Sequence, residues 1–242
     1  MNLKDKKINI GGVFLNNLTK EELIGRVKEF LNDDKQRYFV TPNPEFVVYA
    51  QKDSEFKEIL NKAEISLPDG VGLVVASLMK YHRKIKRLPG TDTVEFLALK
   101  LADQKARIAF LGGLDDVALR AAEKMRKKYG NENIFGFPDG TSNEIINNAR
   151  PQIIFVGIGS PKQERWIVEN MKKIPSGKIF MGVGGAFDFI SDKVKRAPKA
   201  VREMGLEWLF RLILQPFRWK RAIRATLIFM AVVLKDIFFP AK

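Results

Sequence analysis

Apolar residues along the chain fall into short continuous runs and into longer stretches with helical spacing. The short runs predict strands at 38–40, 65–67, 108–111, 134–137, 153–156 and 179–181. The helical spacing predicts intervening helices at 54–61, 71–79, 93–101, 115–129 and 161–171. Strands that alternate with helices are typical of βαβ units. The pattern therefore predicts an α/β fold with a mainly parallel sheet.

The first forty residues add two local signals. Residues 8–17, INIGGVFLNN, have the pattern of a short hairpin with a Gly-Gly turn. Thr19 with Glu22 three positions later forms a capping box, which predicts the start of a helix. The apolar face of this helix consists of Leu23, Val27, Phe30 and Leu31.

The stretch between Gly136 and Gln152 is short for a crossover connection. It has room only for a brief helix around 143–149. A βαβ crossover needs at least about 10–12 residues including its helix. Either this crossover is cramped or residues are missing between the two positions.

Composition limits the class of protein. The chain has 242 residues, 45% of them hydrophobic, which suffices for one large domain or a domain with an appendage. Cysteine is absent, so disulfides and thiolate metal sites are excluded, and a reducing compartment is expected. His82 is the sole histidine and is interpreted as a solvated loop residue. The first ten residues contain no apolar signal segment, which predicts a cytoplasmic protein.

Positive charge is concentrated at the C-terminal end. The net charge is +14, and residues 196–242 hold ten Lys/Arg against three Asp/Glu, a net of +7. The other +7 is spread over 195 residues, so the tail has about four times their charge density. We therefore predict an α/β core at 1–195 and a helical, basic appendage at 196–242. Such an excess attracts polyanions.

The tail combines its charges with large apolar and aromatic side chains. Its longest uncharged run after Arg224 covers 225–234, ten residues, whereas a helix needs about 20 to span a bilayer. We therefore expect the tail to lie on an anionic membrane surface. The alternatives are a helix docked on the core or a homo-oligomer interface. Nucleic acid is not expected as a partner, because no RRM, KH, zinc-finger or helix-turn-helix signature accompanies the charge.

Five strand-like runs end in small, polar, turn-forming clusters. These segments are YFVTPNP, ISLPDG, IAFLGG, IIFVGIGSPKQE and IFMGVGGAFD. Ligands bind outside the carboxyl ends of the strands in open parallel sheets. The clusters are thus expected to form one site. Asp69 is the only carboxylate in the first two turns and is the first candidate for a catalytic group.

Each motif at these strand ends also has a purely structural interpretation. Thr41 and Asn43 in T-P-N-P suit hydrogen bonding to a sugar or phosphate, but Asn43 could equally cap a helix that begins at Pro44. The L-P-D-G segment around Asp69 could be a plain turn, because Pro, Asp and Gly all favour turns.

Two glycine-rich segments are candidates for ligand binding. Residues 157–164, GIGSPKQE, open a helix whose free N–H groups could hold a phosphate. They are not the dinucleotide fingerprint, since its third glycine is absent and Lys162 stands there. Residues 182–188, GVGGAFD, allow backbone to approach a ligand closely. The residues expected to bind the ligand lie in these two segments and at the strand end F-L-G-G. They are Gly112, Gly113, Gly159, Lys162, Gln163, Glu164, Gly184 and Gly185.

The combination of T-P-N-P-E, L-P-D-G, P-G-T-D, F-L-G-G, G-x-P-K-Q-E and V-G-G-A-F-D resembles the WecG/TagA/CpsF family of glycosyltransferases, and its TagA branch most. The resemblance covers about residues 8–239 and implies a Rossmann-like core with helices on both faces. It further implies transfer of N-acetylmannosamine from UDP-ManNAc to undecaprenyl-diphosphate-GlcNAc, which forms the β1,4 linkage-unit disaccharide of wall teichoic acid. The implied reaction is inverting, needs no metal or other cofactor, and takes place at the inner face of the plasma membrane, where the protein would be peripheral.

Residue chemistry agrees with these implications. An inverting transfer needs a base for the acceptor hydroxyl, and Asp69 on its turn fits this role. No Asp-x-Asp occurs in the sequence, so cations must neutralise the departing UDP. The candidates are Arg87 in the core and three appendage residues, Arg211, Arg218 and Arg221. Thr41 and Asn43 would orient a sugar, and Gln163 with Glu164 would hold the nucleotide.

Two other functions compete with this interpretation. One is a non-catalytic peripheral membrane protein that senses nucleotide-sugar through the same pocket. The other is a nucleotide-dependent oxidoreductase or methyltransferase, which the incomplete G-x-G-x-x-G disfavours. Which amino sugar is transferred cannot be derived from the residues, because one stereocentre distinguishes the candidates.

Overall fold

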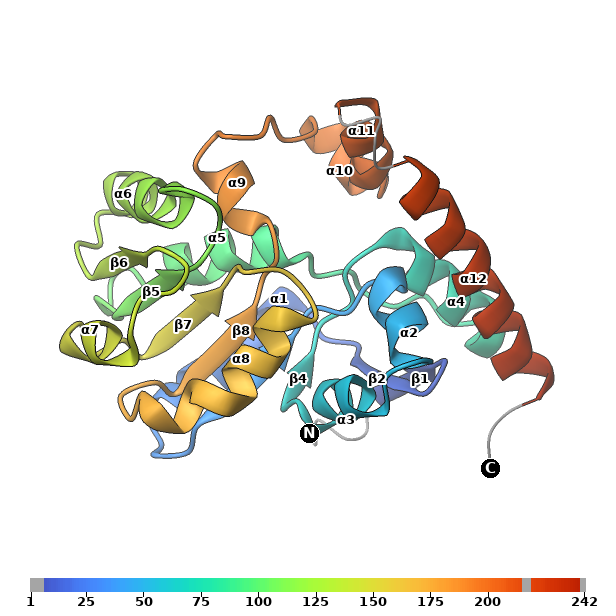
Figure 1. Ribbon diagram of the computed structural model, residues 1–242, viewed down its shortest axis with the longest axis horizontal. Helices are drawn as coiled ribbons and strands as arrows, with labels where there is room; N and C mark the ends of the chain where they lie inside the picture. The colour runs from blue at the N-terminus through green and yellow to red at the C-terminus, as the bar shows by residue number, and fades with distance from the viewer. Residues whose placement is uncertain (1–6, 215–218, 240–242) are drawn as a thin grey trace.

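A six-stranded parallel sheet forms the centre of the molecule (Figure 1). The computed structural model describes residues 7–214 and 219–239. The strand order is β4-β3-β8-β7-β5-β6, and every neighbouring pair is parallel. The strands are β3 (Arg37–Val40), β4 (Ile65–Ser66), β5 (Ile108–Leu111), β6 (Ile134–Phe137), β7 (Ile153–Val156) and β8 (Ile179–Gly182). The predicted α/β fold with its mainly parallel sheet is confirmed.

Helices connect the strands, close to the predicted positions. They are α1 (Lys20–Leu31), α2 (Pro44–Ala50), α3 (Ser54–Lys62), α4 (Val71–Tyr81), α5 (Gly90–Lys100), α6 (Val117–Tyr129), α7 (Asn143–Asn148), α8 (Lys162–Asn170) and α9 (Ala186–Ile190). The short α7 fits the brief crossover expected after Gly136. Helix α5 begins at Gly90 and not at Thr93, because Pro89 already has the backbone of an N-cap residue.

Both faces of the sheet are covered by helices. In β7, Ile153 and Phe155 belong to a cluster with α1, α5, α6 and α9, whereas Ile154 and Val156 pack with α7 and α8. Strands buried on both faces read as continuous apolar runs, which explains their clear signal in the sequence. Phe187 of α9 stacks on Phe110 of β5 at 5.0 Å between ring centroids. This contact fixes the turn that follows β8.

The N-terminal predictions are also confirmed. Strands β1 (Lys7–Ile10) and β2 (Val13–Asn16) pair antiparallel, and Gly11 and Gly12 both have positive φ in the turn. At the start of α1, the Glu22 N–H donates to Thr19 Oγ1 at 3.1 Å and the Thr19 N–H donates to Glu22 Oε2 at 2.8 Å. These reciprocal bonds are the expected capping box.

The C-terminal segment is helical, as predicted, and consists of α10 (Lys199–Glu203), α11 (Glu207–Leu214) and α12 (Trp219–Phe238). Helix α12 packs against α2 and α4 at one end of the sheet (Figure 1). Phe229 and Val233 are buried there. Asp236 accepts hydrogen bonds from the Gly11 N–H at 2.8 Å and from Lys80 Nζ at 2.7 Å. Over the described ranges, every helix is too short or too polar to span a bilayer.

Candidate active site

The turn that carries Asp69 lies between two other segments at the carboxyl edge of the sheet. Strands β3 and β4 are neighbours, so the turns that follow them are adjacent. The Asp69 N–H donates to the Pro42 carbonyl at 2.8 Å, and the Leu88 N–H donates to the Pro68 carbonyl at 2.9 Å. These bonds hold the L-P-D-G turn between the T-P-N-P loop and the start of α5.

The carboxyl group of Asp69 is bound through one oxygen. Oδ2 accepts a hydrogen bond of 3.2 Å from the Gly90 N–H in the first turn of α5, where backbone donors lack helical partners. No hydrogen bond within the described ranges engages Oδ1, and the residue is partly exposed. The arrangement fixes the carboxyl group and leaves one oxygen available to a ligand.

The environment of Asp69 makes it more basic than an ordinary aspartate. Desolvation by the surrounding protein raises the pKa of Asp69 to about 6, although the Gly90 N–H and the charge of Arg87 oppose the rise. The carboxylates of Glu207 and Asp92 raise the pKa further. The group is therefore mainly ionised at pH 7 and still able to take a proton.

Thr41 and Asn43 lie next to this turn, and both have structural partners. Thr41 Oγ1 donates to the Gly182 carbonyl at 2.9 Å and is buried, so it ties the end of β3 to the end of β8. Asn43 caps α2, since its Oδ1 accepts from the Phe46 N–H at 3.1 Å. The cap interpretation of Asn43 is confirmed. Its amide NH2 makes no hydrogen bond among the described residues.

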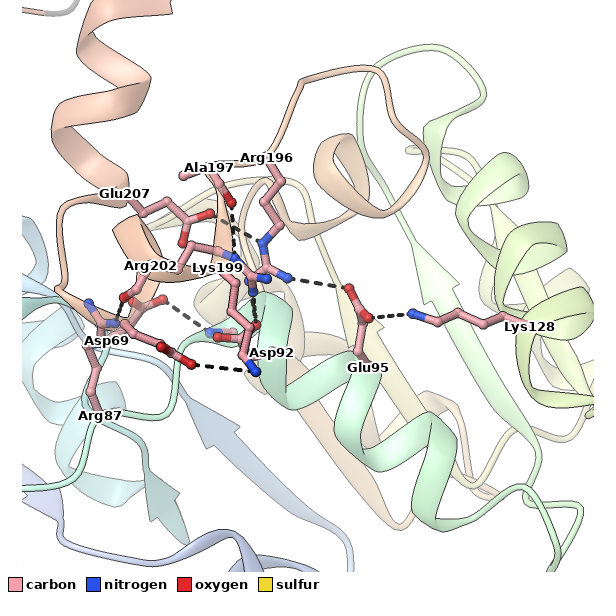
Figure 2. Close-up of polar contacts among 12 residues, drawn as sticks. Asp69, Arg87, Asp92, Glu95, Lys128, Arg196, Ala197, Lys199, Arg202 and Glu207 are labelled. Carbon is pink, nitrogen blue, oxygen red and sulfur yellow. Dashed lines mark hydrogen bonds and ion pairs between the residues drawn. The ribbon is translucent and has the colours of Figure 1, made fainter.

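Arg87 connects the Asp69 turn to the C-terminal segment (Figure 2). Its guanidinium donates to the backbone carbonyl of Arg202. The Arg202 side chain in turn forms an ion pair with Asp92 of α5 at 3.0 Å. Arg196 binds the same carboxylate at 2.6 Å. Residues 196–207 therefore lie next to the site, held by α5 and Arg87.

Arg196 is the centre of this cluster of charges. Besides Asp92, it contacts Glu95 of α5 at 3.4 Å and Glu207 of α11 at 3.3 Å (Figure 2). Its side chain is mostly buried, which strengthens the ion pairs relative to exposed ones. Sequence reasoning missed these residues. The one local signal in the sequence is Asp92, the aspartate of P-G-T-D.

The three appendage arginines lie wholly or partly outside the described part of the chain. Arg218 lies outside the described residues. Arg211 is on α11 and Arg221 is on α12, but their side chains are also outside the described part. Their role at the leaving group stays a prediction.

The strand-end glycines differ in what surrounds them. Gly159 and Gly184 both have positive φ, and nothing lies within 4 Å of the position of a Cβ atom, so their backbone faces open space. Gly112 instead packs against Ile158, and Gly113 packs against Val117. Gly185 is the N-cap of the short α9. Gly159 and Gly184 are the ones whose surroundings leave room for a ligand.

The P-K-Q-E segment places its side chains in different environments. Gln163 is buried, accepts from the Gly184 N–H at 2.9 Å and donates to Glu164 Oε1 at 2.6 Å. Glu164 has no exposed surface, its Oε2 has no partner among the described residues, and burial raises its pKa. Lys162 is exposed. Glu164 therefore holds Gln163, and Gln163 in turn binds the backbone of the glycine turn at Gly184.

Comparison with known proteins identifies the family of this chain. The family model described as "Glycosyl transferase WecG/TagA/CpsF family" matches residues 8–242 of the chain. The chain is 34% identical over 202 residues to the N-acetylglucosaminyldiphosphoundecaprenol N-acetyl-beta-D-mannosaminyltransferase of Bacillus subtilis (strain 168), covering 81% of this chain and 78% of that one. It is 31% identical over 240 residues to the enzyme of the same name from Staphylococcus aureus (strain MRSA252), covering 95% and 92%. The chain belongs to the WecG/TagA/CpsF family of glycosyl transferases.

Proposed function

We propose that this protein transfers N-acetylmannosamine from UDP-ManNAc to the 4-hydroxyl of undecaprenyl-diphosphate-GlcNAc. The product would be the β1,4-linked disaccharide of the wall teichoic acid linkage unit. Relatives that align with most of the chain carry the name of this transferase. The observation that supports the proposal most is the carboxyl group of Asp69, which is held through Oδ2 and open at Oδ1 at the carboxyl edge of the sheet.

Asp69 is the general base in this proposal. The acceptor O4 attacks C1 of the sugar on the face opposite UDP, and the new C1–O bond forms as the bond to UDP breaks. The O4 proton moves to Asp69 Oδ1, and UDP leaves with the bonding electron pair. A positioned base contributes about 10²–10⁴-fold to the rate. A pKa of about 6 suits this task at neutral pH.

Cationic groups would stabilise the negative charge that develops on UDP. Arg87 is the described candidate, because its charge already acts on Asp69 and its guanidinium is held by the Arg202 carbonyl. Three arginines of the appendage would add further positive charge beside the departing UDP: Arg211, Arg218 and Arg221. Fixed charges that need no reorganisation stabilise developing charge effectively.

The UDP-sugar donor would bind along the strand ends, where it would contact the protein backbone near Gly159 and Gly184. Both glycines face open space. Gln163 fixes the turn at Gly184 through its amide oxygen, and Glu164 holds the Gln163 amide nitrogen. We thus assign Gln163 to positioning of the nucleotide site and Glu164 to support of Gln163.

The lipid acceptor places the enzyme at a membrane, and we propose a cytoplasmic protein that is peripheral on the inner face of the plasma membrane. Large apolar side chains of the C-terminal helices are exposed, which is typical of an interfacial helix. These residues are Trp208, Leu209, Ile213, Trp219, Ile223, Leu227, Leu234, Phe238 and Phe239.

Turnover tests the proposal against a non-catalytic sensor. The wild-type protein is mixed with UDP-ManNAc and a synthetic GlcNAc-diphospholipid, and formation of the disaccharide and release of UDP are followed. A transferase forms both products in equal amounts. Binding of UDP-ManNAc without product would instead support the sensor.

A further inference from the structure

Helix α4 has an apolar face that the rest of the described chain covers only in part. Leu73, Ala76 and Ser77 point into the core. The remaining face carries Val75, Leu78, Met79 and Tyr81, each 37–43% exposed. The outer face of a surface helix is normally polar, and a helix that is apolar all round normally has an apolar neighbour on each side. This face of α4 therefore marks a contact surface.

The end of this face is strongly basic. Arg83 and Lys84 come directly after His82, the C-cap of α4, are exposed, and form no ion pair among the described residues. The sequence from 71 to 91 contains five Lys/Arg and no Asp/Glu. Apolar side chains beside unpaired cations complement a surface with negative headgroups above an apolar layer.

The apolar face of α4 adjoins the exposed face of α12. The two helices lie side by side at one end of the molecule (Figure 1), and Lys80 pairs with Asp236 at 2.7 Å. Gly72 of α4 lies against the Phe229 ring. Val75 and Met79 follow Gly72 by three and seven positions, so they lie on its side of the helix. Two segments far apart in the sequence thus present neighbouring apolar surfaces.

We propose that α4 and residues 82–84 form a membrane-binding surface that the core supplies itself, with anionic phospholipid as the ligand. The inference rests on the proposed function in that the substrate is a lipid, and it adds a contact that does not depend on the tail. A second copy of the chain fits this face less well. A two-fold interface centred on α4 would bring the same surface of both copies together, including the cationic residues.

Removal of exposed apolar area tests the surface in the full chain. Leu78→Gln with Met79→Gln takes two apolar side chains from α4. The matched control is Leu99→Gln with Leu119→Gln, which removes two side chains of similar exposure from α5 and α6. Co-sedimentation with phosphatidylglycerol–phosphatidylcholine vesicles should show binding weakened about tenfold or more by the α4 pair. The control pair should bind like wild type.

Charge is tested separately. Arg83→Gln with Lys84→Gln should weaken binding to phosphatidylglycerol vesicles by roughly tenfold to thirtyfold, because each near-surface cation adds to the attraction. Binding to pure phosphatidylcholine should be the same as that of wild type. Lys100→Gln with Lys172→Gln removes two exposed cations elsewhere and should leave both affinities unchanged.

Turnover of a water-soluble acceptor separates this inference from the proposed function. All four double variants should keep the wild-type rate, since none of the changed residues belongs to the site. Unchanged vesicle binding in both α4 variants would overturn the inference, whatever the turnover. It would also be overturned if Leu78→Gln with Met79→Gln lowered the sedimentation coefficient while vesicle binding stayed the same, because a second copy would then cover the face.

Discussion

Asp69 Oδ2 accepts a hydrogen bond of 3.2 Å from the backbone N–H of Gly90, the first residue of α5. The partially positive helix N-terminus favours the ionised carboxylate, whereas desolvation favours the neutral acid. Desolvation is the larger effect and raises the pKa of Asp69 to about 6. The same bond fixes the carboxyl group, so this contact holds the candidate base in position and limits the rise of its pKa.

The pH dependence of turnover should follow the titration of Asp69. A general base works only when it is deprotonated, so kcat/KM should fall as the pH falls through about 6. The expected slope is about tenfold per pH unit on the acid side. The measurement uses a soluble acceptor between pH 4.5 and 8, with circular dichroism at each pH to show that the protein stays folded. A rate that is constant down to pH 4.5 would contradict the assignment.

Chelators should leave the activity intact. No Asp-x-Asp occurs in the sequence, and in the described ranges no three His or carboxylate side chains gather as metal ligands would. We expect the same initial rate in EDTA as in buffer. A rate that EDTA abolishes and Mg²⁺ or Mn²⁺ restores would reveal a metal requirement.

Glu164 should act as the hydrogen-bond acceptor that holds Gln163. Glu164→Gln keeps an oxygen that can accept from Gln163, so stability and activity should remain near those of wild type. Glu164→Ala removes the acceptor and leaves a cavity, and should cost about 2–4 kcal/mol of unfolding free energy. KM for the UDP-sugar should rise with it. Denaturant titration and steady-state kinetics measure both effects.

The two Glu164 variants also differ in the pH dependence of stability. Burial raises the pKa of Glu164 above its ordinary value of 4.5, so the folded protein holds this proton to a higher pH than the unfolded chain does. The unfolding free energy of the wild type should therefore decline as the pH rises above 4.5, with a smaller decline in Glu164→Gln. Identical pH profiles would contradict a raised pKa for Glu164 in the folded protein.

Truncation before Arg196 tests the separation into core and appendage. It should leave a folded α/β core that binds anionic vesicles much more weakly than the full chain, because only the α4 surface remains. The core should be less stable, because removal of Phe229 and Val233 exposes the apolar surface on which α12 packs. We also expect slower turnover of a soluble acceptor, since Arg87 loses its contact with the Arg202 carbonyl.

Single replacements of Arg211, Arg218 and Arg221 by glutamate distinguish an anchor from a lid over the site. Vesicle binding and turnover of the soluble acceptor are measured side by side. A lid residue slows turnover of soluble acceptor, whereas a pure anchor affects only vesicle binding. If soluble turnover is unchanged in all three variants and in the truncation, the appendage is only an anchor.

The sequence predicts the strands well because fully buried parallel strands are continuous apolar runs. The bounds of β5, β6 and β7 are those expected from the sequence. The sequence predicts the start of α5 three residues late, because Gly90 is a weak helix former and its N–H is satisfied by Asp69 from a distant turn. Local propensity contains no information about such a partner.

The ion cluster beside the site shows what a single sequence leaves undetermined. Arg196 and Arg202 lie 104 and 110 positions from Asp92, and nothing in their local sequence identifies this partner. The burial of Glu164 has a similar cause, since P-K-Q-E shows a charged residue in the first turn of a helix but not the packing around it. Chemistry at strand ends is predictable from motifs, whereas pairing across the fold requires the structure.

The most direct test of the central claim is turnover by Asp69→Asn with UDP-ManNAc and the synthetic lipid-diphosphate acceptor. Asparagine keeps an oxygen for the Gly90 N–H but cannot take the acceptor proton, so turnover should fall by about 10²–10⁴-fold while UDP affinity stays near wild type. The variant should be at least as stable as wild type at pH 7, because it avoids the desolvation of a charged group. Near-normal turnover in Asp69→Asn would contradict the account.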